Sequence, residues 1–402
     1  MKILFNQAGL FILLCCIEVL LPIFDPESSI NSLVFWSVLG ISLFYASKLL
    51  DKINAIPILK PLYILIAMFV IYGLIYYLDG PTYMSPATGE PLHKLSYTTA
   101  ILKSLLPIFP IYYYSKKGLI NEKFIKIWII PFVFVGVISY IDQLQAALLR
   151  HLMDDDVTNN GGYFIASLIP LVVFVSPKKI VQYIYILICL IFVIYSMKRG
   201  AILFAGLMIM IYFYNLLSGI SSQKKFGILL SSSILILGVY IFISKYMIEN
   251  LYFLDRIQET LEGNTSDRDS LYGEFLQHVL DKATIFQQLF GGGADYTLSV
   301  SFNYAHNDWI EILVNQGIFG VLIFYMYWNG FYKTAFKSQL SKDYKMVIQM
   351  IFIAYLAKTM FSMSYTTYNI FINLCLGFCL SKICRNNIYT RYENSIFYRT
   401  HK

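Results

Sequence analysis

Long apolar stretches recur along the whole chain, and they constrain its fold more than any other feature. Hydrophobic residues make up 57% of the 402 and charged residues only 14%, whereas soluble domains carry about 25% charged residues. A helix needs about 20 largely apolar residues to cross a bilayer. About twelve stretches approach this length, which predicts an all-α polytopic membrane protein. They are residues 3–24, 29–50, 57–78, 98–115, 124–142, 161–177, 180–197, 199–217, 226–244, 308–329, 345–362 and 366–384.

The basic residues predict on which side of the membrane each loop lies, because lysine and arginine concentrate in cytoplasmic loops. With the N-terminus in the cytoplasm, most of the 31 Lys and Arg residues fall in cytoplasmic segments, with clusters at 116–126, 333–345 and 382–402. We therefore expect both termini to be cytoplasmic. The net charge of +7 is then a topology signal and does not indicate a nucleic-acid partner.

One long polar segment divides the chain. Residues 1–244 hold predicted spans one to nine, 245–307 form a loop on the outer side, and 308–402 hold spans ten to twelve and a cytoplasmic tail. Helical spacing of apolar residues over 247–262 and 268–290 predicts helices in this loop, and the glycine run 291–293 predicts a break. We expect a large, partly helical cap outside the membrane.

The cap ends at His306, where the polar loop runs into an apolar stretch. Asp308 and Glu311 resemble a capping box, which predicts a helix that begins at about Asp308. His306 then lies just outside the helix, at the membrane surface. A neutral imidazole can accept a proton from a hydroxyl, but a histidine that merely anchors a helix end is an equal alternative from the residue alone.

The residues after His306 continue this pattern into the predicted span. Asn307, Glu311 and Asn315 are four residues apart and would form a polar stripe at membrane depth, where polar groups normally face a cavity or another helix. Gly317 and Gly320 lie on one helical face, where small residues permit close contact between helices.

Two adjacent cations, Lys198 and Arg199, break the charge rule in a tight outer turn that ends at Gly200. They could simply extend toward the headgroups. Alternatively they form an anion site: a guanidinium fits phosphate, the helix N-terminus adds a favourable dipole, and glycine allows close approach to the backbone.

Other charged residues are weaker candidates. Arg268 lies between two aspartates that could pair with it in water, but it could also begin a loop helix that aims it at the membrane. Lys103 and Lys358 lie within predicted spans, where ionisable residues are often functional unless they extend outward. The aspartates 154–156 are adjacent and do not face one point, and the six cysteines show no metal-ligand spacing. No metal site is predicted.

Three of these features, in this order and on one side of the membrane, resemble the O-antigen ligase and polymerase superfamily. Its His-Asn-x9-Gly-x2-Gly pattern is matched from His306-Asn307 to Gly320. Lys198-Arg199-Gly200-Ala201 is similar to its Ser-Arg-Gly-Ala element, with Lys198 in place of the usual serine. Arg268 is similar to its loop arginine that precedes a Gly-x-Gly, and the glycine run 291–293 is a looser match to that element.

The resemblance implies glycosyl transfer at the periplasmic face of the bacterial inner membrane. The donor would be an oligosaccharide on undecaprenyl pyrophosphate, with its lipid chain among the spans and surrounding membrane lipid. His306 would act as general base, while Arg199 and Arg268 would hold the pyrophosphate. Substrate-binding residues would be Lys198, Gly200, Asn307, Asp308 and Glu311. The implied reaction uses no cofactor or metal and inverts the anomeric centre.

Two members of the superfamily and one other class of protein compete as interpretations. A polymerase joins lipid-linked repeat units and could act with a chain-length regulator protein, whereas a ligase transfers the finished chain to lipid A-core. The richness in Ile, Phe, Tyr, Asn and Lys is typical of polysaccharide gene clusters and favours the polymerase. A non-enzymatic flippase or transporter would show charges along both halves of the bundle, whereas here they concentrate at one outer end.

Overall fold

The computed structural model describes residues 6–25, 28–86, 89–151, 159–218, 268–364 and 369–383, and a few isolated residues between 227 and 245. Within these ranges all regular structure is helical, apart from one isolated bridge between Met84 and Pro91. The all-α prediction is confirmed for this part of the chain. Most of the predicted span 226–244, the predicted loop helix 247–262 and the aspartates 154–156 lie outside the described residues.

Most predicted spans correspond to single helices whose ends differ by a few residues from the expected ones. The continuous helices are α1 (Gln7–Phe24), α2 (Ser29–Lys48), α3 (Leu59–Asp79), α6 (Glu122–His151), α9 (Lys179–Tyr195), α10 (Arg199–Leu217), α16 (Asp308–Tyr332), α17 (Lys342–Lys358) and α18 (Ile370–Ser381).

Two predicted spans are broken into shorter helices. One consists of α4 (Ser96–Leu105) and α5 (Ile108–Lys116), on either side of Pro107. The other consists of α7 (Gly161–Ala166), a 3-10 turn that contains Pro170, and α8 (Val172–Val175). Proline removes a backbone donor and collides with the preceding helical turn, which explains both breaks.

In the described part of the chain, six helices are long and apolar enough to cross a membrane: α1, α2, α3, α6, α10 and α16. Shorter apolar helical segments cover Gly161–Val175, Lys179–Tyr195 and Ile370–Ser381. The chain is thus a helical membrane protein, and the count of about twelve spans stays a prediction.

The loops predicted to be cytoplasmic gather at one end of this bundle. The Lys116 ammonium donates to the carbonyl of Ile383 at 3.3 Å, and the Lys342 ammonium donates to the carbonyl of Ser218 at 2.6 Å. Loops distant in the sequence therefore meet on one side, as an alternation of spans requires. Which side faces the cytoplasm stays a prediction.

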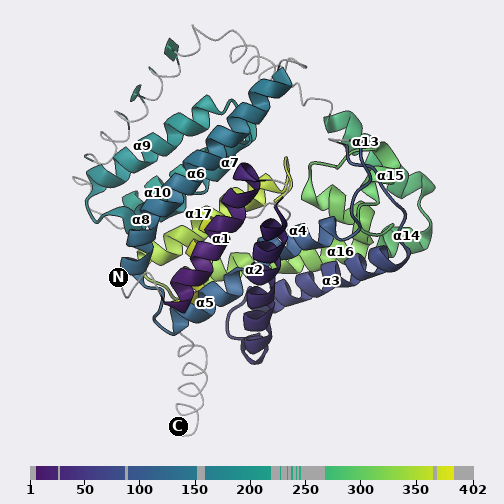
Figure 1. The fold of residues 1–402 in the computed structure, drawn as a ribbon, viewed down its shortest axis with the longest axis horizontal. Coiled ribbons are helices and arrows are strands. Elements are labelled where there is room, and N and C mark those ends of the chain that lie inside the picture. The colour runs from purple at the N-terminus through teal and green to yellow at the C-terminus, as the bar shows by residue number, and fades with distance from the viewer. Residues whose placement is uncertain are drawn as a thin grey trace, which may run out of the picture.

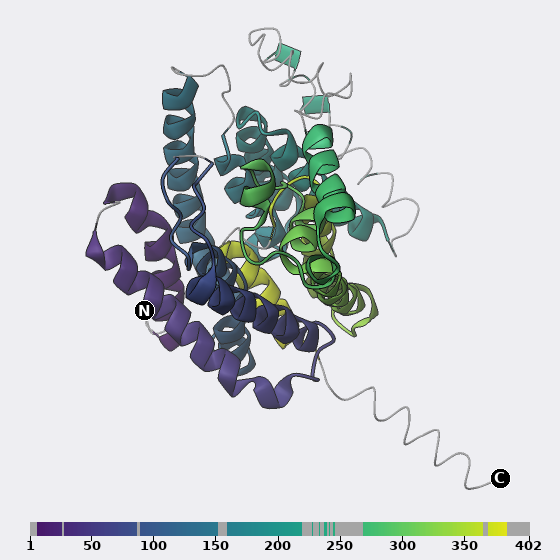
Figure 2. The ribbon, with the colours of Figure 1, turned by 90° about the vertical axis from the view of Figure 1, so that its right-hand side faces the viewer.

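The cap lies at the opposite end. It contains α13 (Arg268–Gln277), a π-helical turn (His278–Lys282), α14 (Ile285–Phe290) and α15 (Thr297–Ser301). Figure 1 shows these elements at the right, beside the ends of α3 and α16, and this end faces the viewer in Figure 2. A small separate core of Phe275, Ala305 and Val314 joins the cap to α16. In this core, Phe275 and the helical residues packed around it follow the apolar spacing predicted over 268–290.

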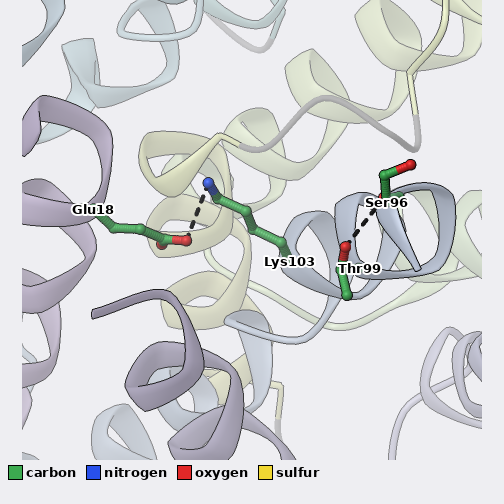
Figure 3. A network of polar contacts seen from close by, with 4 residues as sticks. All are labelled: Glu18, Ser96, Thr99 and Lys103. Carbon is green, nitrogen blue, oxygen red and sulfur yellow. Dashed lines mark hydrogen bonds and ion pairs between the residues drawn. The ribbon is translucent and has the colours of Figure 1, made fainter. Parts of the chain in front are cut away.

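An ion pair joins α1 to α4 inside the bundle (Figure 3). The Lys103 ammonium lies 3.0 Å from a carboxylate oxygen of Glu18, which is almost fully buried. Both residues lie in the outer halves of the predicted spans 3–24 and 98–115, so the pair forms at one depth, as the predicted topology requires. Lys103 therefore has a counter-charge within the protein, on the side of the molecule where α1 and α2 pack.

Candidate active site

Helix α16 begins at Asp308, as predicted, but its cap is different from the expected one. The N-cap is Asn307, whose side-chain oxygen accepts from the amides of Trp309 and Ile310 at 3.0 and 3.3 Å. The capping-box prediction for Asp308 and Glu311 was wrong, because both carboxylates bind other groups. Asparagine is among the best N-cap residues, and the N-cap lies one residue before the predicted one.

His306 lies immediately before this cap in a left-handed conformation, with φ of 51°. That conformation costs a non-glycine residue about 1–2 kcal/mol. Such strain persists only where the surroundings hold it, and it is frequent at functional sites. The half-buried imidazole is thus fixed at the end of the cap, outside the helix.

Two cations from distant parts of the chain lie close to His306. Lys198 is the N-cap of α10, and Arg268 is the first residue of α13. Burial lowers the pKa of His306 below its usual 6.5, and the positive charges of Arg268 and Lys198 lower this pKa further. The imidazole is therefore neutral at pH 7 and able to accept a proton. The structure thus brings together three of the residues that the sequence singled out.

The tight turn between α9 and α10 presents the first of these cations. Met197 has φ of 52°, and the carbonyl of Ser196 accepts from the amide of Asn159 at 2.9 Å. Arg199 follows Lys198 as the first residue of α10. The segment before α7 therefore holds the turn that carries both basic residues in place.

The space beside Gly200 is filled by protein. A Cβ atom at this position would collide with the hydroxyl of Tyr163 and would lie 2.9 Å from the ring of Phe361. Tyr163 also lies near Arg268. Glycine is needed here so that α7 and the segment after α17 can approach α10, and this contact connects the Lys198 turn to Arg268.

The segment 359–364, which we call the platform segment, holds the site together through its backbone. The carbonyl of Phe361 accepts from the Arg268 guanidinium at 2.7 Å. The carbonyl of Met360 accepts from the Asn307 side chain at 3.2 Å, and that of Thr359 accepts from the amide of Asp308 at 2.8 Å. Three consecutive carbonyls thus accept hydrogen bonds from Arg268, at the start of α13, and from the start of α16, directly after His306.

The carboxylate of Asp308 binds Ser364, the last residue of the platform segment. Asp308 is completely buried, and it accepts from the amide of Ser364 at 3.0 and 3.1 Å and from the Ser364 hydroxyl. Lys358, only 3% exposed, attracts this carboxylate and lies 4.8 Å above the ring of Tyr163. Both charged residues bind protein groups, so we assign Asp308 a positioning role in place of the predicted substrate contact.

Glu311 is also completely buried and joins the cap to α16. Its carboxylate accepts from the Thr297 hydroxyl at 2.7 Å, from the amide of Ala305 at 2.8 Å and from the Asn315 side chain at 2.9 Å. Ala305 is the residue before His306. We therefore assign Glu311, like Asp308, to the positioning of the histidine.

Helix α16 is broken at Gly317, which has φ of 67° and ψ of −166°. The break exposes the carbonyls of Val314 and Asn315, which accept from the amides of Gly292 and Gly293, both at 3.0 Å. A Cβ atom on Gly317 would lie 2.5 Å from the backbone of Gly291. The predicted contact between spans is thus replaced by a contact with the cap. The polar stripe lies before the break: the cap binds Glu311 and Asn315, and the platform segment binds Asn307.

Asp295 is a buried acid that no motif or spacing in the sequence marks. It is 1% exposed, has φ of 58°, and neither carboxylate oxygen has a hydrogen-bond partner among the described residues. Burial raises its pKa to about 7, with a contribution from the negative charge of Glu311. Tyr76, Tyr83 and Tyr304 lie near it. The acid is therefore largely protonated below neutral pH.

We expect Asp295→Asn to stabilise the cap most above pH 7 and clearly less at pH 5. A raised folded-state pKa means that wild-type stability falls as pH rises from about 4 to about 7 and stays reduced above that. A rise of the pKa from 3.8 to about 7 corresponds to about 4 kcal/mol at most. Hydrogen exchange of residues 268–305 at pH 5 and pH 8 measures the effect. Equal exchange differences between the two proteins at both pH values would contradict it.

A cavity of about 60 Å³ lies behind the platform segment, between α3, α4, α16, α17 and α18. Its lining includes the polar residues Ser104, Ser364, Asn369 and Asn373. It has room for a few water molecules and is far too small for a polyprenyl chain. This cavity does not provide the predicted place for the lipid among the spans.

Comparison with known proteins agrees with the site geometry. Residues 184–325 match the family model of the O-antigen ligase family. The matched segment contains Lys198, Arg268 and His306, and it ends before the platform segment. No curated protein matches the chain. The match confirms the resemblance to the O-antigen ligase and polymerase superfamily over residues 184–325, the segment that carries the cap and the three converging residues.

Proposed function

We propose that the chain is an O-antigen polymerase, a glycosyltransferase of the bacterial inner membrane. It joins oligosaccharide repeat units that are linked to undecaprenyl pyrophosphate, at the periplasmic face, and both termini are cytoplasmic. The supporting observation is a neutral His306 beside the cations Arg268 and Lys198 at the outer end of the bundle. A proton acceptor next to fixed positive charge suits transfer from a pyrophosphate donor.

In the proposed reaction an acceptor hydroxyl attacks the anomeric carbon of the donor. A new C–O bond forms, the bond to pyrophosphate breaks, and the leaving group keeps the electron pair. His306 takes the hydroxyl proton. Arg268, Arg199 and Lys198 stabilise the negative charge on the leaving pyrophosphate. A single displacement of this kind inverts the anomeric centre.

The geometry gives each residue a reason for its position. Arg268 uses one guanidinium nitrogen to bind the carbonyl of Phe361, which fixes the plane of the group, and an arginine has further donors for phosphate oxygens. The cations supply the positive charge that the leaving group needs, so the proposed reaction requires no metal. The charge concentrated at one outer end favours an enzyme over a flippase.

A ligase is the second candidate, because the matched family model is described as O-antigen ligase. The two activities use the same donor and differ in the acceptor. A polymerase accepts another lipid-linked repeat unit, and a ligase accepts lipid A-core. The preference for the polymerase rests on the amino-acid composition described above.

The test is transfer by the purified protein in lipid nanodiscs, with one lipid-linked repeat as donor and each acceptor supplied separately. We expect a ladder of lipid-linked oligomers with the repeat unit alone. Transfer only to lipid A-core would replace the polymerase by the ligase. No transfer to either acceptor, with the protein still folded, would overturn both. A chain-length regulator, added in a parallel reaction, should change the length of the ladder and not its formation.

A further inference from the structure

Helix α14 of the cap has an inverted distribution of polar and apolar side chains. Ile285 is 71% exposed and Phe286 is 66% exposed. Its polar side chains bind groups of the cap: Gln287 donates to the Tyr296 hydroxyl at 3.3 Å, and Gln288 donates to the carbonyl of Val279 at 2.9 Å. A helix in water shows the opposite arrangement. This distribution suits an apolar environment around α14.

The exposed side of α14 is continuous with the exposed apolar side of the span that follows Gly317. The rings of Phe286 and Phe290 lie 4.9 Å apart, and Phe290 stacks on Phe319 of α16 at 5.0 Å. Ile318, Phe319 and Leu322 are themselves exposed. These residues belong to a helix that is apolar and long enough to cross the membrane, where exposed apolar side chains face lipid.

Contacts with α3 fix the depth of α14 relative to the spans. The hydroxyl of Tyr72 in α3 binds the carbonyl of Phe290. At the other end of α16, a Cβ atom on Gly330 would lie 2.7 Å from the carbonyl of Pro57, so α3 and α16 run side by side in opposite directions. At 1.5 Å per residue, Phe290 lies about 10 Å inward from the outer end of α3. That end is where a span of this length leaves the hydrocarbon.

We infer that α14 lies within the outer leaflet of the membrane, with Ile285, Phe286 and Phe290 against the acyl chains of the lipid. The partner of this surface is therefore the bilayer itself. Helix α14 thus anchors the cap in the membrane. In the chain it directly precedes the glycine run, whose amides bind the carbonyls of Val314 and Asn315. The inference does not depend on the proposed glycosyl transfer.

The test places a spin label at position 286 through Phe286→Cys, in the full chain in lipid nanodiscs. The five cysteines that the structure describes are buried, and Cys384 is replaced by serine. Collision with oxygen, which dissolves in lipid, is compared with collision with a water-soluble nickel complex. Tyr325→Cys, exposed on α16, provides the lipid reference, and Glu274→Cys, exposed on α13, provides the water reference.

We expect the label at 286 to match the label at 325, with high oxygen and low nickel accessibility. A label that matches position 274 would place α14 in water and overturn the inference. Low accessibility to both reagents would also overturn it, because the label would then lie against protein, such as a second copy of the chain. Glycosyl transfer is not measured in this test, so the result stands whether or not the proposed function holds.

Discussion

His306→Ala should lower the rate of glycosyl transfer by about 10²–10⁴-fold, the usual contribution of a positioned general base. The loss follows because no other group that we have placed beside Arg268 and Lys198 can take the acceptor proton. Transfer by the purified variant in nanodiscs measures the effect. His278→Ala is the matched control, because His278 lies in the same cap and has its ring 3.3 Å from the Tyr296 hydroxyl. It should retain near wild-type transfer.

The pH profile separates the role of a base from that of an anchor. The pKa of His306 is lowered, so its neutral form dominates at pH 7, and transfer should fall only as pH drops through a value below 6.5. Lys198→Met removes a positive charge and should move this acid limb to higher pH. If the limb is unchanged in Lys198→Met and His306→Ala keeps wild-type transfer, the assignment of His306 as base is wrong.

The second large effect is expected for Asp308→Ala, which should destabilise the protein by about 3–5 kcal/mol and greatly reduce transfer. The carboxylate is completely buried and offsets the charge of the buried Lys358, and loss of one member of a buried charge interaction is strongly destabilising. The amide of Ser364 also loses its acceptor. The platform segment then no longer holds Arg268 through the carbonyl of Phe361. Unfolding in detergent and transfer in nanodiscs measure the two losses.

A double variant distinguishes the lost charge pair from the lost platform. Asp308→Ala with Lys358→Met removes both charges and should recover part of the stability, since the buried charge that Asp308 offsets is removed with it. Transfer should stay low, because Ser364 still lacks its acceptor. Ser364→Ala alone should cost only about 1 kcal/mol, since the backbone amide remains bound. Full recovery of transfer in the double variant would show that the platform does not position the site.

The sequence predicted the parts of the site that depend on side-chain type and local spacing. Lys198 and His306 were found because charge or imidazole at an apolar boundary is unusual, and Arg268 was found as a possible start of a loop helix and through the family resemblance; the three converge in the structure. The start of α16 was found because a polar segment meets an apolar one there. The cap residue was misread because Asn307 and Asp308 are both good N-cap residues.

The remaining features could not be predicted because they depend on backbone groups or on tertiary contacts. The carbonyls of residues 359–361 are present in any sequence, so no motif marks the platform segment. Gly317 fits both a helical stripe and a helix break, and only the contact with Gly291 decides between them. Asp295 is one acid among several in an acidic loop, and its burial follows from how the cap folds onto α3.

The position of the platform segment bears on how such proteins can be recombined. The segment that matches the family ends at residue 325, yet the guanidinium and the helix start that carry the site are bound by carbonyls of residues 359–361. Residues 184–325 are therefore not an exchangeable cassette. A chimera that takes this region from a relative must also take the turn after α17, because hydrogen bonds between the two segments hold the site.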